Sequence, residues 1–149
     1  MGALIAGVTM PAILVKQGQF EDVDLSLLSV DQQKLPATVA RIKTSLCNAP
    51  AWPGDPVIVM DHYGATRSHI ISPQILQFTL RSKFSTLIED VTTTGSSGSG
   101  VFDPRRKCLL GIMSRAFWAG DKPVAKYFVP AAEIRDFIPD EFRAQIKMK

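Results

Sequence analysis

The sequence is poor in the residues that build metal sites and disulfide frameworks. It contains two cysteines, Cys47 and Cys108, and two histidines in 149 residues. The cysteines are far apart and form no CxxC pair, so neither a zinc knuckle nor a disulfide framework is indicated, and a single disulfide remains open. No His, Cys or carboxylate cluster has ligand spacing, so we expect neither a metal nor an organic cofactor.

Strong charge and long apolar runs are also absent. Lys plus Arg number 17 and Asp plus Glu 14, which gives a formal net charge of +3. The longest basic run, Arg105 to Lys107, is short, so we do not expect nucleic acid as a partner. The apolar stretch from Met1 to Val15 lacks a basic leading region, is too short to span a bilayer and is interrupted by Pro11, so we expect no membrane segment. The compartment stays unknown: cytoplasmic, or periplasmic or secreted if an N-terminal part is missing.

What the sequence does have is a series of short apolar runs, each bounded by Gly, Pro, Asp or Asn. This pattern predicts an all-β protein. The Asp103 to Arg106 segment, with Pro104 at the second position, predicts a type I turn and hence a hairpin. The expected strands are Leu4–Val8, Ala12–Val15, Asp24–Val30, Ala37–Ile42, Val57–Asp61, Ile75–Ser82, Ser85–Ile88, Gly100–Phe102, Cys108–Ser114 and Tyr127–Val129.

Helical periodicity begins only after Pro130. The apolar residues there predict a C-terminal helix that is kinked or restarted at Pro139. The segment from Cys47 to Asp55 is rich in Pro and Gly, and we expect it to connect two β units. The residues at helical spacing are Ile134, Phe137, Ile138, Phe142 and Ile146.

A run of Thr, Ser and Gly covers residues 92–100. A flexible linker is the simplest interpretation, but the run leads straight into Val101 and the predicted hairpin, which favours a tight structured loop. Gly95 and Gly100 have the GxxxxG spacing of a phosphate loop, yet Val101 stands where that loop requires Lys. The GxSxG elbow of α/β-hydrolases also fails, because Ser99 replaces its second Gly.

The loop Gly95-Ser96-Ser97-Gly98-Ser99-Gly100-Val101 resembles the GxSGG or GxSGS nucleophile loop of trypsin-like serine proteases. The resemblance implies that Ser97 is the nucleophile. It also implies an oxyanion hole made by the backbone N–H groups of Gly95 and Ser97, which the glycines let converge on one oxygen.

Asp24 and the apolar residues after it resemble the strand of that family that opens with the triad aspartate. The resemblance implies that Asp24 is the orienting acid. Asp22 could claim the same role. We prefer Asp24 because it directly abuts the buried-looking run of Leu25, Leu27 and Leu28, where a carboxylate needs a partner to offset desolvation.

Further segments follow in the family's order. Gly54–Val59 resembles the start of the second barrel in bacterial HtrA-type proteases. Leu109–Ser114 is similar to the strand after the nucleophile, and Tyr127–Pro130 to the last strand before a terminal helix. The resemblance implies a trypsin-like double β-barrel with a C-terminal helix, divided into an incomplete N-terminal barrel over residues 1–48 and a C-terminal barrel over 49–149.

The histidine of the family's His, Asp, Ser order is missing. His62 and His69 both lie between Asp24 and Ser97. The family position is upstream of Asp24 and falls before Met1, so we expect a protease domain that lacks its N-terminal part and is inactive as this chain, because serine at its ordinary pKa is a poor nucleophile. His62 could substitute from its loop, although a surface position is the simpler interpretation for both histidines.

The resemblance also implies a polypeptide substrate and a pocket for the residue before the cut. No acid lies at the expected pocket base, which disfavours Lys and Arg substrates, and a small or apolar residue is the default expectation. Arg115, if it points inward, favours an acidic residue instead. The expected substrate-binding residues are Thr92, Thr93, Ser114, Arg115 and Ala116.

Two further expectations concern the strand edges and the absent histidine. An incomplete barrel exposes strand edges, which favours a homo-oligomer formed through those edges. The alternative function is a non-catalytic, protease-like β-barrel module that binds peptides or a protein partner, and it explains the absent histidine without truncation.

Overall fold

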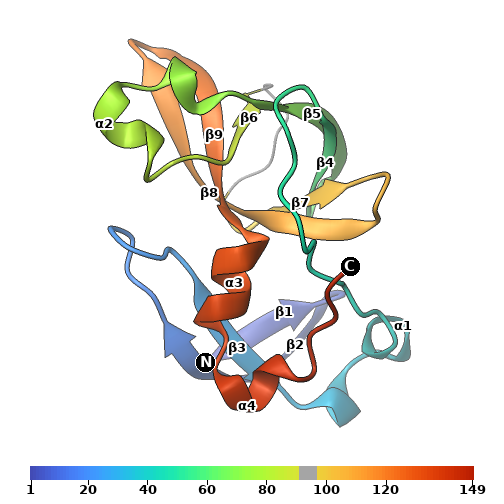
Figure 1. The fold of residues 1–149 in the computed structure, drawn as a ribbon. Helices are drawn as coiled ribbons and strands as arrows, with labels where there is room; N and C mark the ends of the chain where they lie inside the picture. The colour runs from blue at the N-terminus through green and yellow to red at the C-terminus, as the bar shows by residue number, and fades with distance from the viewer. Residues whose placement is uncertain (91–96) are drawn as a thin grey trace.

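The computed structural model describes residues 1–90 and 97–149, which form an open three-stranded sheet and a closed six-stranded barrel (Figure 1). The all-β, trypsin-like expectation is therefore confirmed, with short helices in the connections and at the C-terminus. The strands are β1 (Gly2–Ile5), β2 (Val8–Gln17), β3 (Ser26–Val30), β4 (Pro56–Asp61), β5 (Gly64–Ile71), β6 (Leu87–Glu89), β7 (Gly100–Asp103), β8 (Cys108–Ala119) and β9 (Lys122–Pro130).

The open sheet has the order β1-β2-β3, and all its pairs are antiparallel. A two-residue turn joins β1 to β2, with positive φ at both Ala6 (50°) and Gly7 (79°). Such turns match the twist of the flanking strands. Met10 and Ala12 of β2 are buried, and most other side chains of the sheet are half-buried or exposed. The outer edges of β1 and β3 pair with no strand of the described chain.

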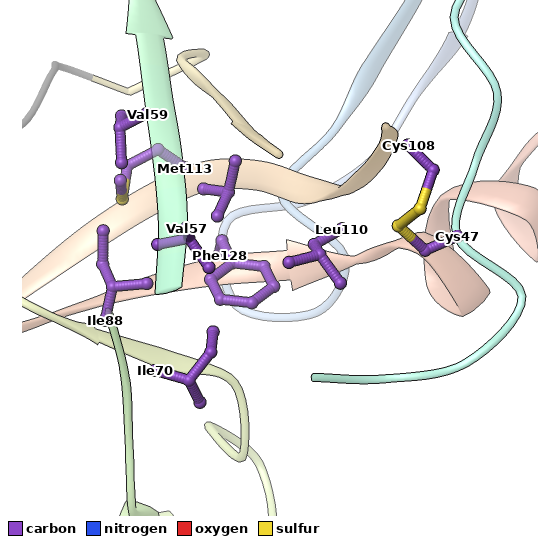
Figure 2. Close-up of a cluster of buried hydrophobic side chains, with 10 residues drawn as sticks. Cys47, Val57, Val59, Ile70, Ile88, Cys108, Leu110, Met113 and Phe128 are labelled. Atoms are coloured by element: carbon purple, nitrogen blue, oxygen red, sulfur yellow. A yellow bond between two sulfur atoms is a disulfide. The ribbon is translucent and has the colours of Figure 1, made fainter. Parts of the chain in front are cut away.

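The barrel closes in the order β4-β5-β6-β9-β8-β7. Closure pairs every strand of the barrel on both sides over at least part of its length. The second half of β8 extends beyond β7 and pairs with β9 alone. Alternate residues of β4, Val57 and Val59, point inward and are 1% and 2% exposed. They pack with Ile88, Leu110 and the Phe128 ring in the centre of the barrel (Figure 2).

The C-terminal helix restarts at Pro139, as the sequence predicts. Helix α3 (Ala131–Phe137) ends at Ile138, which has the extended conformation that a following proline favours, and α4 (Asp140–Arg143) begins directly after Pro139. Helix α3 leads from the barrel toward the open sheet (Figure 1). At its C-terminal end, Lys16 of β2 donates from Nζ to Phe137 O (2.9 Å) and lies over the Phe137 ring.

Cys47 and Cys108 form a disulfide, which answers the question that their spacing left open. The bond joins the connection between the two β units to the first residue of β8. The backbone of this connection pairs on one side with β8, through Cys47 N–H to Leu109 O (2.9 Å), and on the other with the C-terminal residues, through Leu46 N–H to Lys147 O (2.8 Å). The disulfide therefore anchors a segment that also holds the C-terminus.

Two predicted strands are wrong, a third, Leu4–Val8, spans the turn between β1 and β2, and one strand was not predicted. Ala37–Ile42 contains the short helix α1 (Ala37–Ala40), and Ile75–Ser82 contains the end of the 3₁₀ helix η2 (Pro73–Ile75) and the helix α2 (Phe78–Arg81). Proline at or just before the first helical position starts such turns. Strand β5 escaped prediction because Thr66 and Ser68, which pair with the inward-facing Val59 and Val57, are polar, so the strand shows no alternation of apolar and polar residues. A second 3₁₀ turn, η1 (Gln32–Lys34), follows β3.

The predicted hairpin after Val101 is confirmed. β7 and β8 pair antiparallel, and the turn between them is closed by a hydrogen bond from Lys107 N–H to Asp103 O (2.9 Å). The buried carboxylate of Asp103 accepts from the backbone N–H groups of Arg105 and Arg106 and from the Arg106 side chain. Burial alone raises the pKa of Asp103, but these hydrogen bonds outweigh it and hold the pKa below its usual value.

Candidate active site

Ser97 lies in the turn that leads into β7, and its side chain is exposed. Its Oγ donates a hydrogen bond to the backbone oxygen of Ser114 in β8 (2.8 Å). The next residue, Gly98, has φ +90°, a conformation that glycine adopts without strain. Backbone hydrogen bonds from Gly98 to Met113 and from Met113 to Ser99, both 2.8 Å, fix this turn against β8.

A β-bulge in β8 sets the position of Ser114. The pairing of β8 with β9 shifts between Met113 and Arg115, so Ser114 has no partner in β9. As a result two consecutive residues are buried: Met113 enters the barrel core and Ser114 faces the open sheet. Bulges often re-aim side chains in this way beside active sites.

The carboxylate of Asp24 accepts a hydrogen bond from the Ser114 hydroxyl at 2.7 Å (Oγ to Oδ2). Ser114 therefore contacts both predicted catalytic residues, Ser97 through its backbone oxygen and Asp24 through its hydroxyl. These contacts bring together residues from the open sheet, β8 and the Ser/Gly loop, which are far apart in the sequence.

Asp24 ends a loop over residues 18–24 that needs glycine at its start. The backbone N–H of Gly18 donates to Leu25 O (2.7 Å), and a side chain at position 18 would place its Cβ 1.9 Å from Val23 O. The apolar run after Asp24 is less buried than expected, since Leu28 is 41% exposed. Val23 of the loop and Leu25 directly after it nevertheless pack against a buried apolar cluster that includes Phe84 and Tyr127.

Arg115 does not lie free along a pocket wall. Its guanidinium stacks over the Phe20 ring (3.9 Å to the centroid) and approaches the Phe84 ring (4.9 Å), and one Nη donates to Phe20 O. Sequence reasoning missed Phe20 and Phe84, because neither belongs to a recognised motif. Ala116, the next residue of β8, is half-buried and pairs with Lys126.

Burial raises the pKa of two groups near this loop, one in β9 and one in α3. The pKa of Tyr127 rises to about 12, mainly through burial and then through the Glu133 carboxylate. The pKa of Glu133 is also raised, first by burial and then by the like charge of Asp22. Asp22 thus faces Glu133, whereas Asp24 contacts Ser114.

The remaining predicted residues stand as follows. Thr92, Thr93 and Gly95 lie outside the described residues. His62 stacks on Tyr63 in the turn between β4 and β5, and His69 lies 3.4 Å from the Glu89 carboxylate (Nδ1 to Oε2). Within residues 1–90 and 97–149 no hydrogen bond joins either histidine to Ser97. In the same residues no cluster of His, Cys, Asp and Glu is arranged to hold a metal, and no helix is long and apolar enough to cross a membrane.

A family model for the trypsin-like peptidase domain matches residues 2–112. The chain belongs to the trypsin-like peptidase family. No curated protein and no solved structure matches it significantly. The match runs from the open sheet through Asp24 and the Ser/Gly loop into β8, and it ends at residue 112, two residues before Ser114. The family supports a hydrolase of the serine protease type.

Proposed function

We propose that this trypsin-like domain carries the nucleophile and the orienting acid of a serine endopeptidase, Ser97 and Asp24, but not the histidine that acts between them. The observation that carries the proposal is the pair of hydrogen bonds through Ser114, which links the two residues across the molecule. In a serine protease triad the acid orients the base and stabilises its charged form, while the serine attacks the scissile carbonyl.

The proposed oxyanion hole consists of the backbone N–H groups of Gly95 and Ser97. The left-handed conformation of Gly98 supports it, because the chain turns sharply directly after the nucleophile. Donors placed in this way stabilise the charge that develops on the substrate oxygen. Thr92 and Thr93 remain the proposed base of the specificity pocket.

We attribute the missing base to a segment absent from these 149 residues, as the resemblance to HtrA-type peptidases implies. Support comes from the open sheet, which leaves two cavities of about 590 and 350 Å³ against the C-terminal segment. Val30 and Ile138 are apolar and line both cavities. A missing set of strands would fill this space. Because the base is missing as well, the chain by itself would hydrolyse peptides very slowly.

A polypeptide substrate is proposed to pair with β8 from Ser114 to Ala116. The pairing of β7 with β8 ends at Ile112, whereas β8 continues to Ala119 against β9 alone. One edge of this half of β8 is therefore without a strand partner in the described chain. An extended peptide can add to such an edge through its backbone.

Chemical rescue tests the proposal. Imidazole has the ring and the near-neutral pKa of a histidine side chain, so it can act as the base when it diffuses into the site. We expect imidazole to accelerate the labelling of Ser97 by a fluorophosphonate probe at least tenfold, as a base that takes the Ser97 proton should. The label forms a bond between Ser97 Oγ and phosphorus, fluoride leaves, and imidazole takes the proton.

Matched variants identify the residues. Ser97→Ala should abolish labelling, and Asp24→Asn should remove most of the imidazole effect. Asp22→Asn is the control, because it makes the same change two residues away on the same loop. Loss of rescue in Asp22→Asn alone would transfer the role of the acid to Asp22. Labelling at any other serine, or no acceleration by imidazole, would contradict the proposal.

The second candidate function is a non-catalytic module that binds peptides or a protein partner. The absence of a histidine near Ser97 in the described residues favours it. Peptide binding without imidazole rescue would select this module over the peptidase.

A further inference from the structure

Two cations meet the loop over residues 18–24 from the barrel side. Arg115 of β8 donates to the backbone oxygen of Phe20, and Lys83, which follows α2, donates from Nζ to the backbone oxygen of Glu21 (2.5 Å). These are consecutive carbonyl groups of one loop. The two positive charges therefore lie close together, although they come from elements distant in the sequence.

Neither cation is neutralised by a carboxylate. Seven ion pairs form within residues 1–90 and 97–149, and Lys83 and Arg115 take part in none of them. The neighbouring loop carries three acids, of which Asp24 accepts from Ser114 and Asp22 lines a cavity together with Glu133. The two cations thus have hydrogen bonds to neutral oxygens, and neither forms an ion pair with Glu21, Asp22 or Asp24.

Aromatic rings hold both cations in place. Lys83 Nζ lies 5.5 Å from the centroid of the Phe84 ring, and Arg115 lies between Phe84 and Phe20. Phe84 itself is buried and packs edge-on against Tyr127 and Phe117. Stacking on a fixed ring orders a guanidinium without using its N–H donors.

One N–H donor of Arg115 also has no acceptor. Its Nε is the one buried side-chain nitrogen or oxygen, among the described residues, that has no hydrogen-bond partner. A buried donor without an acceptor costs free energy. Because this Nε is shielded from solvent, an incoming acceptor has to approach the Nη groups of the guanidinium. A carboxylate is the acceptor that best matches the forked geometry of a guanidinium.

The position of Arg115 connects this feature to the proposed substrate path. It follows Ser114 directly, and the backbone oxygen of Ser114 is the group to which Ser97 donates. A peptide paired with the free edge of β8 therefore passes beside the guanidinium. Lys83 is exposed, and its Nζ lies near the Phe84 ring that Arg115 also approaches.

We infer that Arg115, assisted by Lys83, selects peptides that carry an Asp or Glu side chain within the few residues next to the scissile bond. The inference rests on the proposed function, because it places the peptide along β8. It deepens that function by naming an acidic polypeptide as the substrate class. Nucleic acid also carries negative charge, but it has no backbone amide to pair with the free strand edge, so the peptide is favoured.

A binding assay tests the inference without the missing base. The probes are fluorescein-labelled octapeptides of Ala and Val, each with one Glu or one Gln at a given position, and anisotropy is read at low ionic strength. At one or two adjacent positions we expect the Glu peptide to bind at least about tenfold more tightly than its Gln partner, as charge-assisted pairing predicts. Added salt should reduce the difference.

Variants assign the effect. Arg115→Gln should reduce the Glu advantage to less than about twofold while Gln peptides bind as before, and Arg115→Lys should keep part of it. Lys83→Gln should reduce it by a smaller factor. Arg67→Gln is the control, because it removes the same charge from an exposed position on β5 and should change nothing. Thermal melting checks that each variant is folded.

The outcomes separate the inference from the proposed function. Equal binding of Glu and Gln peptides, no peptide binding, or Arg115-dependent binding of a single-stranded oligonucleotide in place of Glu peptides would each overturn the inference. If Glu peptides bind through Arg115 but imidazole does not rescue Ser97 labelling, the inference stands and the peptidase proposal fails. If imidazole rescues labelling but Glu peptides show no preference, the peptidase proposal stands and the inference fails.

Discussion

The two β units of the chain contrast in how completely they bury their side chains. In the barrel, Ile88, Val101 and Cys108 are 0% exposed, whereas Leu4 and Ile13 of the open sheet are 72% and 71% exposed. Every strand of the barrel pairs on both sides over at least part of its length, and β8 lacks a second partner only beyond the end of β7, whereas β1 and β3 of the sheet are edge strands within the described chain. The contrast teaches that the barrel is a finished folding unit and that the sheet depends on contacts from outside itself.

The proposed active site lies where these two units meet, so each unit supplies only some of its residues. The barrel supplies Ser97 and Ser114 from elements fixed by the core. The sheet supplies Asp24 from a loop that depends on the hydrogen bond to Ser114 and on the contacts with Arg115 and Lys83. The proposed missing base belongs to the unit with the open sheet.

The largest expected effect comes from a pair of substitutions that compare the two units. Phe128→Ala removes a ring from the centre of the barrel core and should lower the free energy of unfolding by about 3–5 kcal/mol. Ile13→Ala on the exposed sheet should change it by less than about 0.5 kcal/mol. Urea denaturation of both variants measures the difference. Equal losses would show that the sheet is as well packed as the barrel.

The disulfide should contribute the next largest effect. Cys47 and Cys108 are separated by 61 residues, so removing the bond with Cys47→Ala and Cys108→Ala should cost about 2–4 kcal/mol. The pairing of the 45–48 segment with the C-terminus should also loosen, which faster amide exchange at Leu46 and Asn48 would reveal. Unchanged stability after reduction would mean that this segment is held by its hydrogen bonds alone.

The free edges of the open sheet should make the chain self-associate. Light scattering at increasing concentration should show a growing mass, because unpaired strand edges recruit other chains. Replacing Leu4 and Ile13 with Lys should restore a monomer, since exposed charge next to an edge opposes such pairing. A monomer at every concentration would contradict the incomplete-barrel account.

The smallest expected effect is a pH dependence at the junction of the units. Burial and Asp22 raise the pKa of Glu133, so the folded chain holds this proton more tightly than the unfolded chain. Its stabilising contribution is complete below the ordinary pKa of 4.5 and is lost as the pH rises through the raised value.

The variant Glu133→Gln should flatten this dependence and add less than about 1 kcal/mol of stability at neutral pH, because the side chain is only half-buried. Melting temperatures between pH 4 and pH 8 measure it. A stability that rises with pH in the wild type and not in Glu133→Gln would reverse the assignment.

The sequence predicted the barrel well, because alternating or continuous apolar runs such as those of β4 and β8 report burial directly. The prediction failed where the composition of a segment favours a strand but neighbouring residues start a helical turn. Ile75–Ser82 has the composition of a strand, but Pro73 and the Ser72 hydroxyl, which accepts from Gln74 N–H, start a helical turn just before it. Strand β5 was missed because polar Thr66 and Ser68 occupy its inward face and remove the apolar alternation.

The motif residues of the site could be proposed from sequence, whereas their links could not. Ser97 and Asp24 stand in recognisable patterns. The bulge that turns Ser114 toward Asp24 leaves no mark in the sequence, because it depends on the register of β8 with β9. The same holds for Arg115, whose partners Phe20 and Phe84 approach only in the folded chain.

The most direct test of the account is a double-mutant cycle between Ser114 and Asp24, read as the imidazole-assisted rate of Ser97 labelling. Ser114→Ala and Asp24→Asn should each lower the rate about tenfold or more, as the loss of a hydrogen bond to a charged group predicts. The double variant should be no slower than Asp24→Asn alone, because both changes break one link. Independent, multiplying losses would contradict the claim that Ser114 couples the acid to the nucleophile.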